Sequence, residues 1–185
     1  MTSRVGKLLI AHPNLPKSDW FHKTVIYIYI DNDKDGTIGV VTNVPTTLSV
    51  KKLCYNKGIL FPDNRQLVYK GGPVADNTVM IFHTDEWSNQ NTMSAGSRYS
   101  LTSDNTMFEK LSMGDEPAYW KAIMGICGWR PGQLDLELSG QFPYSAENSW
   151  LTCDANDSIL FEYDGEDQWV KAVELSSQQM INSYF

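Results

Sequence analysis

TVIYIYIDNDKDGTIGVVTN, residues 24–43, sets a polar segment between two apolar runs. Residues 24–30 and 37–43 are rich in Val, Ile, Thr and Tyr, which is typical of strands. The residues between them, 31–36, are Asp, Asn, Lys and Gly, most of which favour tight turns. The stretch therefore predicts a β-hairpin with residues 31–36 at its tip.

The same tip resembles the start of an EF-hand calcium loop, with the pattern D-x-D-x-D-G at Asp31, Asp33, Asp35 and Gly36. An EF-hand needs a bidentate carboxylate at position twelve of the loop, which here is Thr42. It also needs helices on both flanks, whereas these flanks read as strands. A turn is therefore favoured, and an incidental weak cation site is the alternative left open.

Around the hairpin, strand-like and helix-like segments follow one another without a regular alternation. Further strands are predicted at residues 7–11, 66–70 (running into a glycine turn at 71–74), 78–84, 97–103 and 118–129. Helices are predicted at residues 46–56, 102–114, 130–140, 154–161 and 166–178. No repeat or Pro/Gly/Ser-rich linker divides the chain, so residues 1–185 are predicted to form a single domain of the α+β class.

Three details of the helices can be stated from the residues. Gly114 and Gly140 are expected to end the second and third helices, and Pro131 is expected in the first turn of the third. On the last helix, one face is expected to carry Trp169, Ala172, Val173 and Ser176.

Charge and composition exclude several classes of function. The net charge of −7 argues against non-specific affinity for nucleic acid or anionic lipid, and the longest basic run is Lys51-Lys52. No window approaches the roughly 18 apolar residues of a membrane helix. The three cysteines, Cys54, Cys127 and Cys153, are far apart and odd in number, so a reducing cytoplasm is the expected compartment.

Motifs for catalysis, metals and cofactors are missing from the sequence. His12, His22 and His83 do not have zinc-site spacing. There is neither a phosphate-binding glycine loop nor a G-x-S-x-G nucleophile elbow. No catalytic residue, metal site or cofactor is therefore predicted.

Two glycine-containing turns are the candidate positions for a pocket. In YKGGPV, residues 69–74, the glycines are expected to supply a positive φ within a tight turn. In GICGWRPGQLDLEL, residues 125–138, Cys127 lies between two glycines, and Arg130 could supply a positive field. A buried, inert cysteine is the simpler interpretation of this thiol. Candidate pocket or ligand-binding residues are Asn43, Gly71, Gly72, Pro73, Cys127, Trp129 and Gln133.

The order of several short stretches resembles the YqgE/AlgH family. These stretches are LLIAHPNL, FHKTVIYI, GTIGVVTNVP, YKGGPV, MIFHT, GICGWRPGQLDLEL and NSWL. The resemblance runs from about Lys7 to near Val173, and its most specific part is G-G-P followed by G-W-x-x-G-Q-L-x-x-E. It implies a single α+β domain with mixed, partly barrel-like sheets surrounded by helices. Family members are described as transcriptional regulators, and no set of catalytic residues exists to carry over. His12 and Cys127 depart from the family pattern, in which an apolar residue and Ala are usual.

The leading hypothesis is a cytoplasmic regulator that is not an enzyme and that acts through contacts with a protein or a small ligand. Direct DNA binding and membrane binding are not expected. The alternative is a thiol-dependent enzyme or redox protein that uses Cys127 in a pocket near the two turns.

Overall fold

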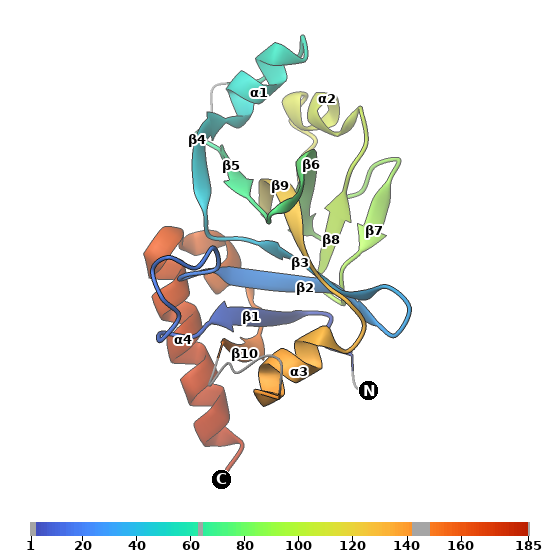
Figure 1. The fold of residues 1–185 in the computed structure, drawn as a ribbon. Coiled ribbons are helices and arrows are strands. Elements are labelled where there is room, and N and C mark those ends of the chain that lie inside the picture. The colour runs from blue at the N-terminus through green and yellow to red at the C-terminus, as the bar shows by residue number, and fades with distance from the viewer. Residues whose placement is uncertain (1–2, 63–64, 142–148, 185) are drawn as a thin grey trace.

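The computed structural model describes residues 3–62, 65–141 and 149–184 (Figure 1). Asn148, the first residue of the NSWL motif, lies outside the described residues. Along the chain the elements are β1 (Lys7–Ala11), β2 (Val25–Asn32), β3 (Gly36–Val41), β4 (Pro45–Ser49), α1 (Val50–Asn56), β5 (Leu67–Lys70), β6 (Val74–Thr84), β7 (Thr92–Ser94), β8 (Tyr99–Thr102), α2 (Met107–Ser112), β9 (Trp120–Trp129), α3 (Gln133–Ser139), β10 (Trp150–Asp154), the π-helical turn η1 (Ser158–Glu162) and α4 (Gly165–Asn182).

The hairpin predicted from residues 24–43 is confirmed. β2 and β3 pair antiparallel from Ile26 opposite Val41 to Asn32 opposite Gly36. The Asn32 side chain closes the turn, because its Oδ1 accepts hydrogen bonds from the backbone N–H groups of Lys34 and Asp35. Gly36 has φ +79°, and a Cβ there would lie 2.1 Å from the carbonyl oxygen of Trp129. Glycine is therefore required both by the turn and by the close passage of β9.

β9 is the centre of the sheet. The described strands form a 10-stranded, curled and mainly antiparallel sheet in the order β10-β1-β2-β3-β9-β6-β8-β7, with β5 added to β9 and β4 added to β5 (Figure 1). The residues of β9 up to Ile126 pair with β5 and β6, and its last three residues pair with β3. Gly125, with φ +87°, lies just before this change of partner strand. One long strand thus joins both parts of the half-barrel.

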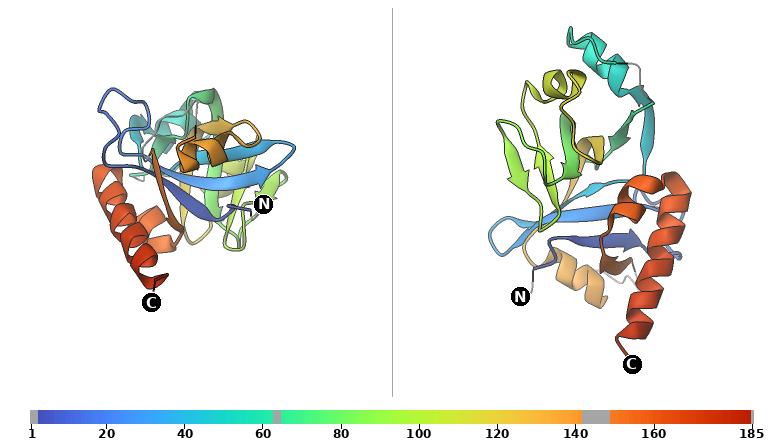
Figure 2. Two further views of the ribbon diagram at one scale, coloured as in Figure 1. Left: turned by 60° about the horizontal axis from the view of Figure 1, so that its bottom comes forward. Right: turned by 180° about the vertical axis from the view of Figure 1, so that it is seen from behind.

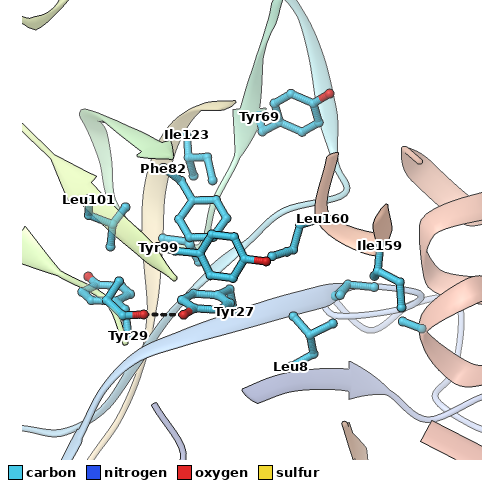
Figure 3. Close-up of a cluster of buried hydrophobic side chains, with 14 of the residues drawn as sticks. Leu8, Tyr27, Tyr29, Tyr69, Phe82, Tyr99, Leu101, Ile123, Ile159 and Leu160 are labelled. Carbon is cyan, nitrogen blue, oxygen red and sulfur yellow. Dashed lines mark hydrogen bonds between the residues drawn. The ribbon is translucent and has the colours of Figure 1, made fainter. Parts of the chain in front are cut away.

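The helices cover the sheet at its margins. Figure 2 shows α4 along one side of the molecule, and α1 and α2 at the end opposite α3. α4 contacts β1, β2 and β10. Its predicted inner face is confirmed, since Ala172 and Ser176 are buried and Trp169 and Val173 pack against the core. Inside the curl, the Tyr27 ring lies 4.8 Å from that of Phe82 (Figure 3). This aromatic core holds the fold together by burying large apolar surfaces.

Several details differ from the sequence predictions. Residues 46–49, expected at the start of a helix, belong to the strand β4, which pairs with β5, and the helix begins only at Val50. Pro131 is not in the first turn of α3, because the helix begins after Gly132, whose φ of +75° turns the chain out of β9. The helix expected at residues 154–161 is a strand end followed by the short π-helical turn η1. β10 was missed because its strand conformation depends on pairing with β1, for example Thr152 with Leu9. Among the described helices, none is both long and apolar enough to span a membrane.

Candidate functional site

The glycines of the G-G-P turn lie against β9. The backbone of Gly71 donates to the carbonyl oxygen of Met124 (2.7 Å) and accepts from the N–H of Val41 (2.8 Å). A Cβ on Gly72 would lie 1.9 Å from the carbonyl oxygen of Ile126. Neither glycine has the positive φ expected from the sequence. Glycine therefore occurs at these two positions because two backbones approach closely, and not because of turn geometry. Pro73, the next residue, is exposed.

Cys127 is enclosed in the same junction. Its side chain is 0% exposed, and its Sγ lies 3.4 Å from the carbonyl oxygen of Gly71. Burial raises the pKa of the Cys127 thiol to about 12, so almost none of it is the reactive thiolate near neutral pH. The structure gives no support to a thiol-dependent mechanism.

The G-W-x-x-G-Q-L-x-x-E motif forms a hydrogen-bonded connection between β9, α3 and β10. Glu137 Oε2 accepts from the indole N–H groups of Trp129 (3.0 Å) and Trp150 (2.9 Å). Gln133 donates to the other oxygen of Glu137 (2.9 Å) and accepts from the backbone N–H of Arg130 (3.1 Å). Trp129 and Gln133 therefore orient the carboxylate that links the two tryptophans.

Asn43 joins the end of β3 to the start of α4. Its Oδ1 accepts from the N–H of Val25 (2.8 Å), and its Nδ2 donates to the carbonyl oxygens of Lys23 (2.9 Å) and Gly165 (2.8 Å). Its own carbonyl oxygen accepts from the N–H of Gly165 (2.9 Å). These contacts explain Asn43 as a buried clamp. A ligand-binding role for it and the other residues selected from the sequence stays a prediction.

Next to this clamp lies a buried lysine that sequence reasoning missed. Lys121, on β9, is 3% exposed. Its Nζ donates to the carbonyl oxygen of Thr42 (2.9 Å), to Asp164 Oδ1 (3.0 Å) and to Gln168 Oε1 (3.2 Å). The ammonium also lies 4.4 Å from the centre of the Tyr69 ring, a cation–π distance. The available signal was a single charge inside the apolar run AYWKAIMGICGW.

The electrostatics of this cluster follow from its burial. Desolvation lowers the pKa of Lys121, while the Asp164 carboxylate acts in the opposite direction. The hydroxyl of Tyr69 donates to Asp164 Oδ1 (2.7 Å), and burial together with this carboxylate raises the pKa of Tyr69. Gln168 is 0% exposed and donates to the hydroxyl of Thr42 (2.7 Å). Every donor of the lysine thus has an acceptor, as a buried charge requires.

An open cleft of about 480 Å³, here called the Lys121 cleft, lies over this cluster. Residues 65–67 and Tyr69 form its first wall, residues 116–121 its second, and Phe161 with Asp164 its third. The rings of Tyr119 and Phe161 are stacked at 5.4 Å between the second and third walls. Aromatic surfaces beside a few charged groups are typical of small-ligand sites.

The hairpin tip is a weaker candidate. A separate cavity there is lined by Asp31, Asp33 and Asp135, among others. Arg4 pairs with both Asp31 and Asp135, and Asp31 also accepts from the hydroxyl of Thr37 (2.6 Å). Two of these carboxylates are thus occupied by protein donors. Within the described ranges, no group of three His, Cys, Asp or Glu side chains is arranged to hold a metal ion.

Comparison with known proteins gives a consistent result. A family model described as AlgH-like matches residues 8–181. A UPF0301 protein of Aliivibrio fischeri strain MJ11 is 32% identical over 174 residues, covering 90% of this chain and 88% of the relative. A UPF0301 protein of Idiomarina loihiensis is 34% identical over 180 residues, covering 94% and 91%.

Two solved structures are similar along nearly the whole chain. The solution structure of the AlgH protein from Pseudomonas aeruginosa has a TM-score of 0.75 at 28% identity, covering 94% of this chain and 89% of the other. A crystal structure of a protein from Corynebacterium diphtheriae has a TM-score of 0.69 at 21% identity, covering 92% and 85%. The second likeness shows the fold alone.

Proposed function

Because the chain belongs to the AlgH-like family, we propose that it is a cytoplasmic regulatory protein that binds a small ligand in the Lys121 cleft and is not an enzyme. The free thiols of its three cysteines suit a reducing compartment. The regulation of transcription that the family resemblance implies is indirect in this proposal, since a net charge of −7 opposes approach to DNA phosphates.

The Lys121 cleft is the observation that carries the proposal. Its volume of about 480 Å³ falls in the range of small-molecule sites. Its walls combine aromatic rings with charged side chains, and the hydrogen bonds of Lys121 hold its floor in one geometry. A preorganised site of this kind binds without first having to order its own side chains.

Binding is favoured over catalysis because the groups that could react are occupied. Lys121 would need a free lone pair to attack a substrate, yet all three of its N–H bonds point to acceptors. The Cys127 thiol is buried and almost entirely protonated at neutral pH.

A ligand screen on matched variants tests the proposal. Tyr119 is 42% exposed and lines the cleft, whereas Tyr55, on α1, is 72% exposed and is not among the residues that line it. Small molecules that raise the melting temperature of the wild-type protein are expected to bind Tyr55→Ala normally. They should bind Tyr119→Ala at least about tenfold more weakly by calorimetry, a loss of ~1.4 kcal/mol.

Equal affinity for the two variants would place the ligand elsewhere and refute the site, and a screen in which no compound binds the wild type would overturn the function. Tight, salt-sensitive binding of random duplex DNA would overturn the indirect route to transcription.

A further inference from the structure

We propose that the Lys121 cleft selects a zwitterionic α-amino acid with an aromatic side chain. This inference rests on the proposed function, because it names the ligand class of the same cleft.

The charges that line the cleft separate into a neutralised pair and an open pair. Lys121 and Asp164 form an ion pair at 3.0 Å, so their charges largely cancel. Arg65, on the first wall, is exposed and forms no ion pair with any described residue. Glu116, on the second wall, likewise has no cationic partner in the described part of the chain. Arg65 and Glu116 are thus the charges left for a ligand.

The two open charges have opposite signs and lie on different walls. Glu116 is exposed, and its Oε2 accepts from the indole N–H of Trp120 (3.2 Å), which orients the carboxylate and leaves Oε1 available. A ligand ammonium fits this carboxylate, whereas a ligand carboxylate fits the planar, bidentate guanidinium of Arg65. A molecule that carries both groups satisfies both walls at once.

Asp164 supplies a further acceptor for the ammonium. Both hydrogen bonds that its carboxylate accepts, from Tyr69 and Lys121, end on Oδ1, and no described residue donates to Oδ2. The side chain is 55% exposed, so ligand atoms can reach it. Since the two donors hold the carboxylate in place, Oδ2 is an oriented acceptor and not a mobile one.

The rings determine the side chain of the ligand. Tyr119 stacks on Phe161 at 5.4 Å with an interplanar angle of 21°, and it remains partly exposed. An aromatic side chain can extend this stack in an offset or edge-on arrangement. A purely anionic ligand would leave Glu116 facing a like charge or no partner. A purely cationic ligand would leave Arg65 in the same position.

Four probes separate these requirements. L-phenylalanine carries all three features, 2-phenylethylamine lacks the carboxylate, 3-phenylpropionate lacks the ammonium and L-alanine lacks the ring. L-phenylalanine is expected to bind at least about tenfold more tightly than each of the others, because each of them leaves part of the site without a partner. Calorimetry measures the affinities, and the change in tryptophan fluorescence, to which Trp120 in the second wall contributes, is a second readout.

Two charge-neutralising variants assign the charges. Arg65→Gln should weaken L-phenylalanine at least about tenfold and leave 2-phenylethylamine unchanged, while Glu116→Gln should weaken L-phenylalanine and leave 3-phenylpropionate unchanged. Lys34→Gln, in the exposed turn of the β2–β3 hairpin, removes the same charge as Arg65→Gln and serves as its control, and it should leave all affinities unchanged.

The outcomes distinguish this inference from the proposed function. If 2-phenylethylamine or 3-phenylpropionate binds as tightly as L-phenylalanine, or if Arg65→Gln weakens every probe equally, the zwitterion is refuted and the cleft remains a ligand site. If no probe binds while another compound binds in a Tyr119-dependent way, the ligand class is wrong and the proposed function stands. If nothing binds the cleft, both fail.

Discussion

Replacing Asn43 with alanine should lower the free energy of unfolding by about 3 kcal/mol, which is a large share of the ~5–15 kcal/mol of a typical domain. Asn43 is 1% exposed, and its amide makes three hydrogen bonds that alanine cannot make. Each bond contributes about 1 kcal/mol net, and the N–H of Val25 would be left buried without its acceptor. The melting temperature should fall by roughly 6–12 °C, at ~2–4 °C per kcal/mol for a chain of this size.

Asn43→Asp tests the direction of the same bonds. The aspartate keeps the acceptor for Val25 but turns a second oxygen toward the carbonyl oxygens of Lys23 and Gly165. Because two acceptors then face each other in a buried position, the loss should equal or exceed that of alanine despite the similar shape.

The free energy of unfolding is measured by urea denaturation, which tryptophan fluorescence and circular dichroism both monitor. Asn14→Ala is the exposed control, and its free energy of unfolding is expected within about 0.5 kcal/mol of the wild-type value. A loss below about 1 kcal/mol for Asn43→Ala would refute the interpretation of Asn43 as a clamp. If that variant were stable but unable to bind the ligand of the cleft, Asn43 would instead be a binding residue.

Three further predictions concern the interior. Gly72→Ala should lower the free energy of unfolding by about 3 kcal/mol or prevent folding, because its Cβ would lie 1.9 Å from a backbone oxygen. The control Gly128→Ala should be tolerated, since nothing lies within 4 Å of its Cβ. Equal denaturation midpoints for the two variants would contradict this prediction. Cys127 should resist a disulfide reagent at about pH 8 in the folded protein and react quickly in guanidinium. Mass spectrometry of the peptide that contains Cys127 measures the labelling. Fast labelling of the native thiol would restore the thiol-based alternative. For Lys121, burial lowers the folded-state pKa below its ordinary value of 10.5, so the folded state binds fewer protons than the unfolded state between the two values. The stability of the wild type relative to Lys121→Met should therefore rise as pH increases toward 10.5, and a gap that stays constant or shrinks would be evidence against a desolvated ammonium.

Much of the fold could be predicted from local patterns. The β2–β3 hairpin, the strand that ends at Trp129, and the buried face of α4 with Ala172 and Ser176 all follow from periodicity and turn residues. Gly140, with φ +64°, ends α3 as expected. β4, β7 and β10 are only three to five residues long, and their conformation comes from neighbouring strands, which a local pattern does not encode.

The candidate site was much less predictable. The residues selected from the glycine-rich turns stand out in the sequence because close backbone approach and a tryptophan–carboxylate network restrict their identity. A sequence displays such restrictions whether they arise from packing or from ligand binding, so unusual residues mark both equally. Here the contacts of Gly72 and of Trp129 are explained by packing.

By itself the sequence determined the longer elements of this protein, its α+β class and its family, because spacing, turn chemistry and ordered motifs are properties of neighbouring residues. Only the tertiary structure decided that Lys121 is buried beside a cleft. Its partner Asp164 is 43 residues away, and the Tyr69 hydroxyl that shares the same carboxylate oxygen is 95 residues from it. Burial and charge pairing depend on distances in space, so they arise only once the curled sheet brings β5, β9 and the start of α4 together.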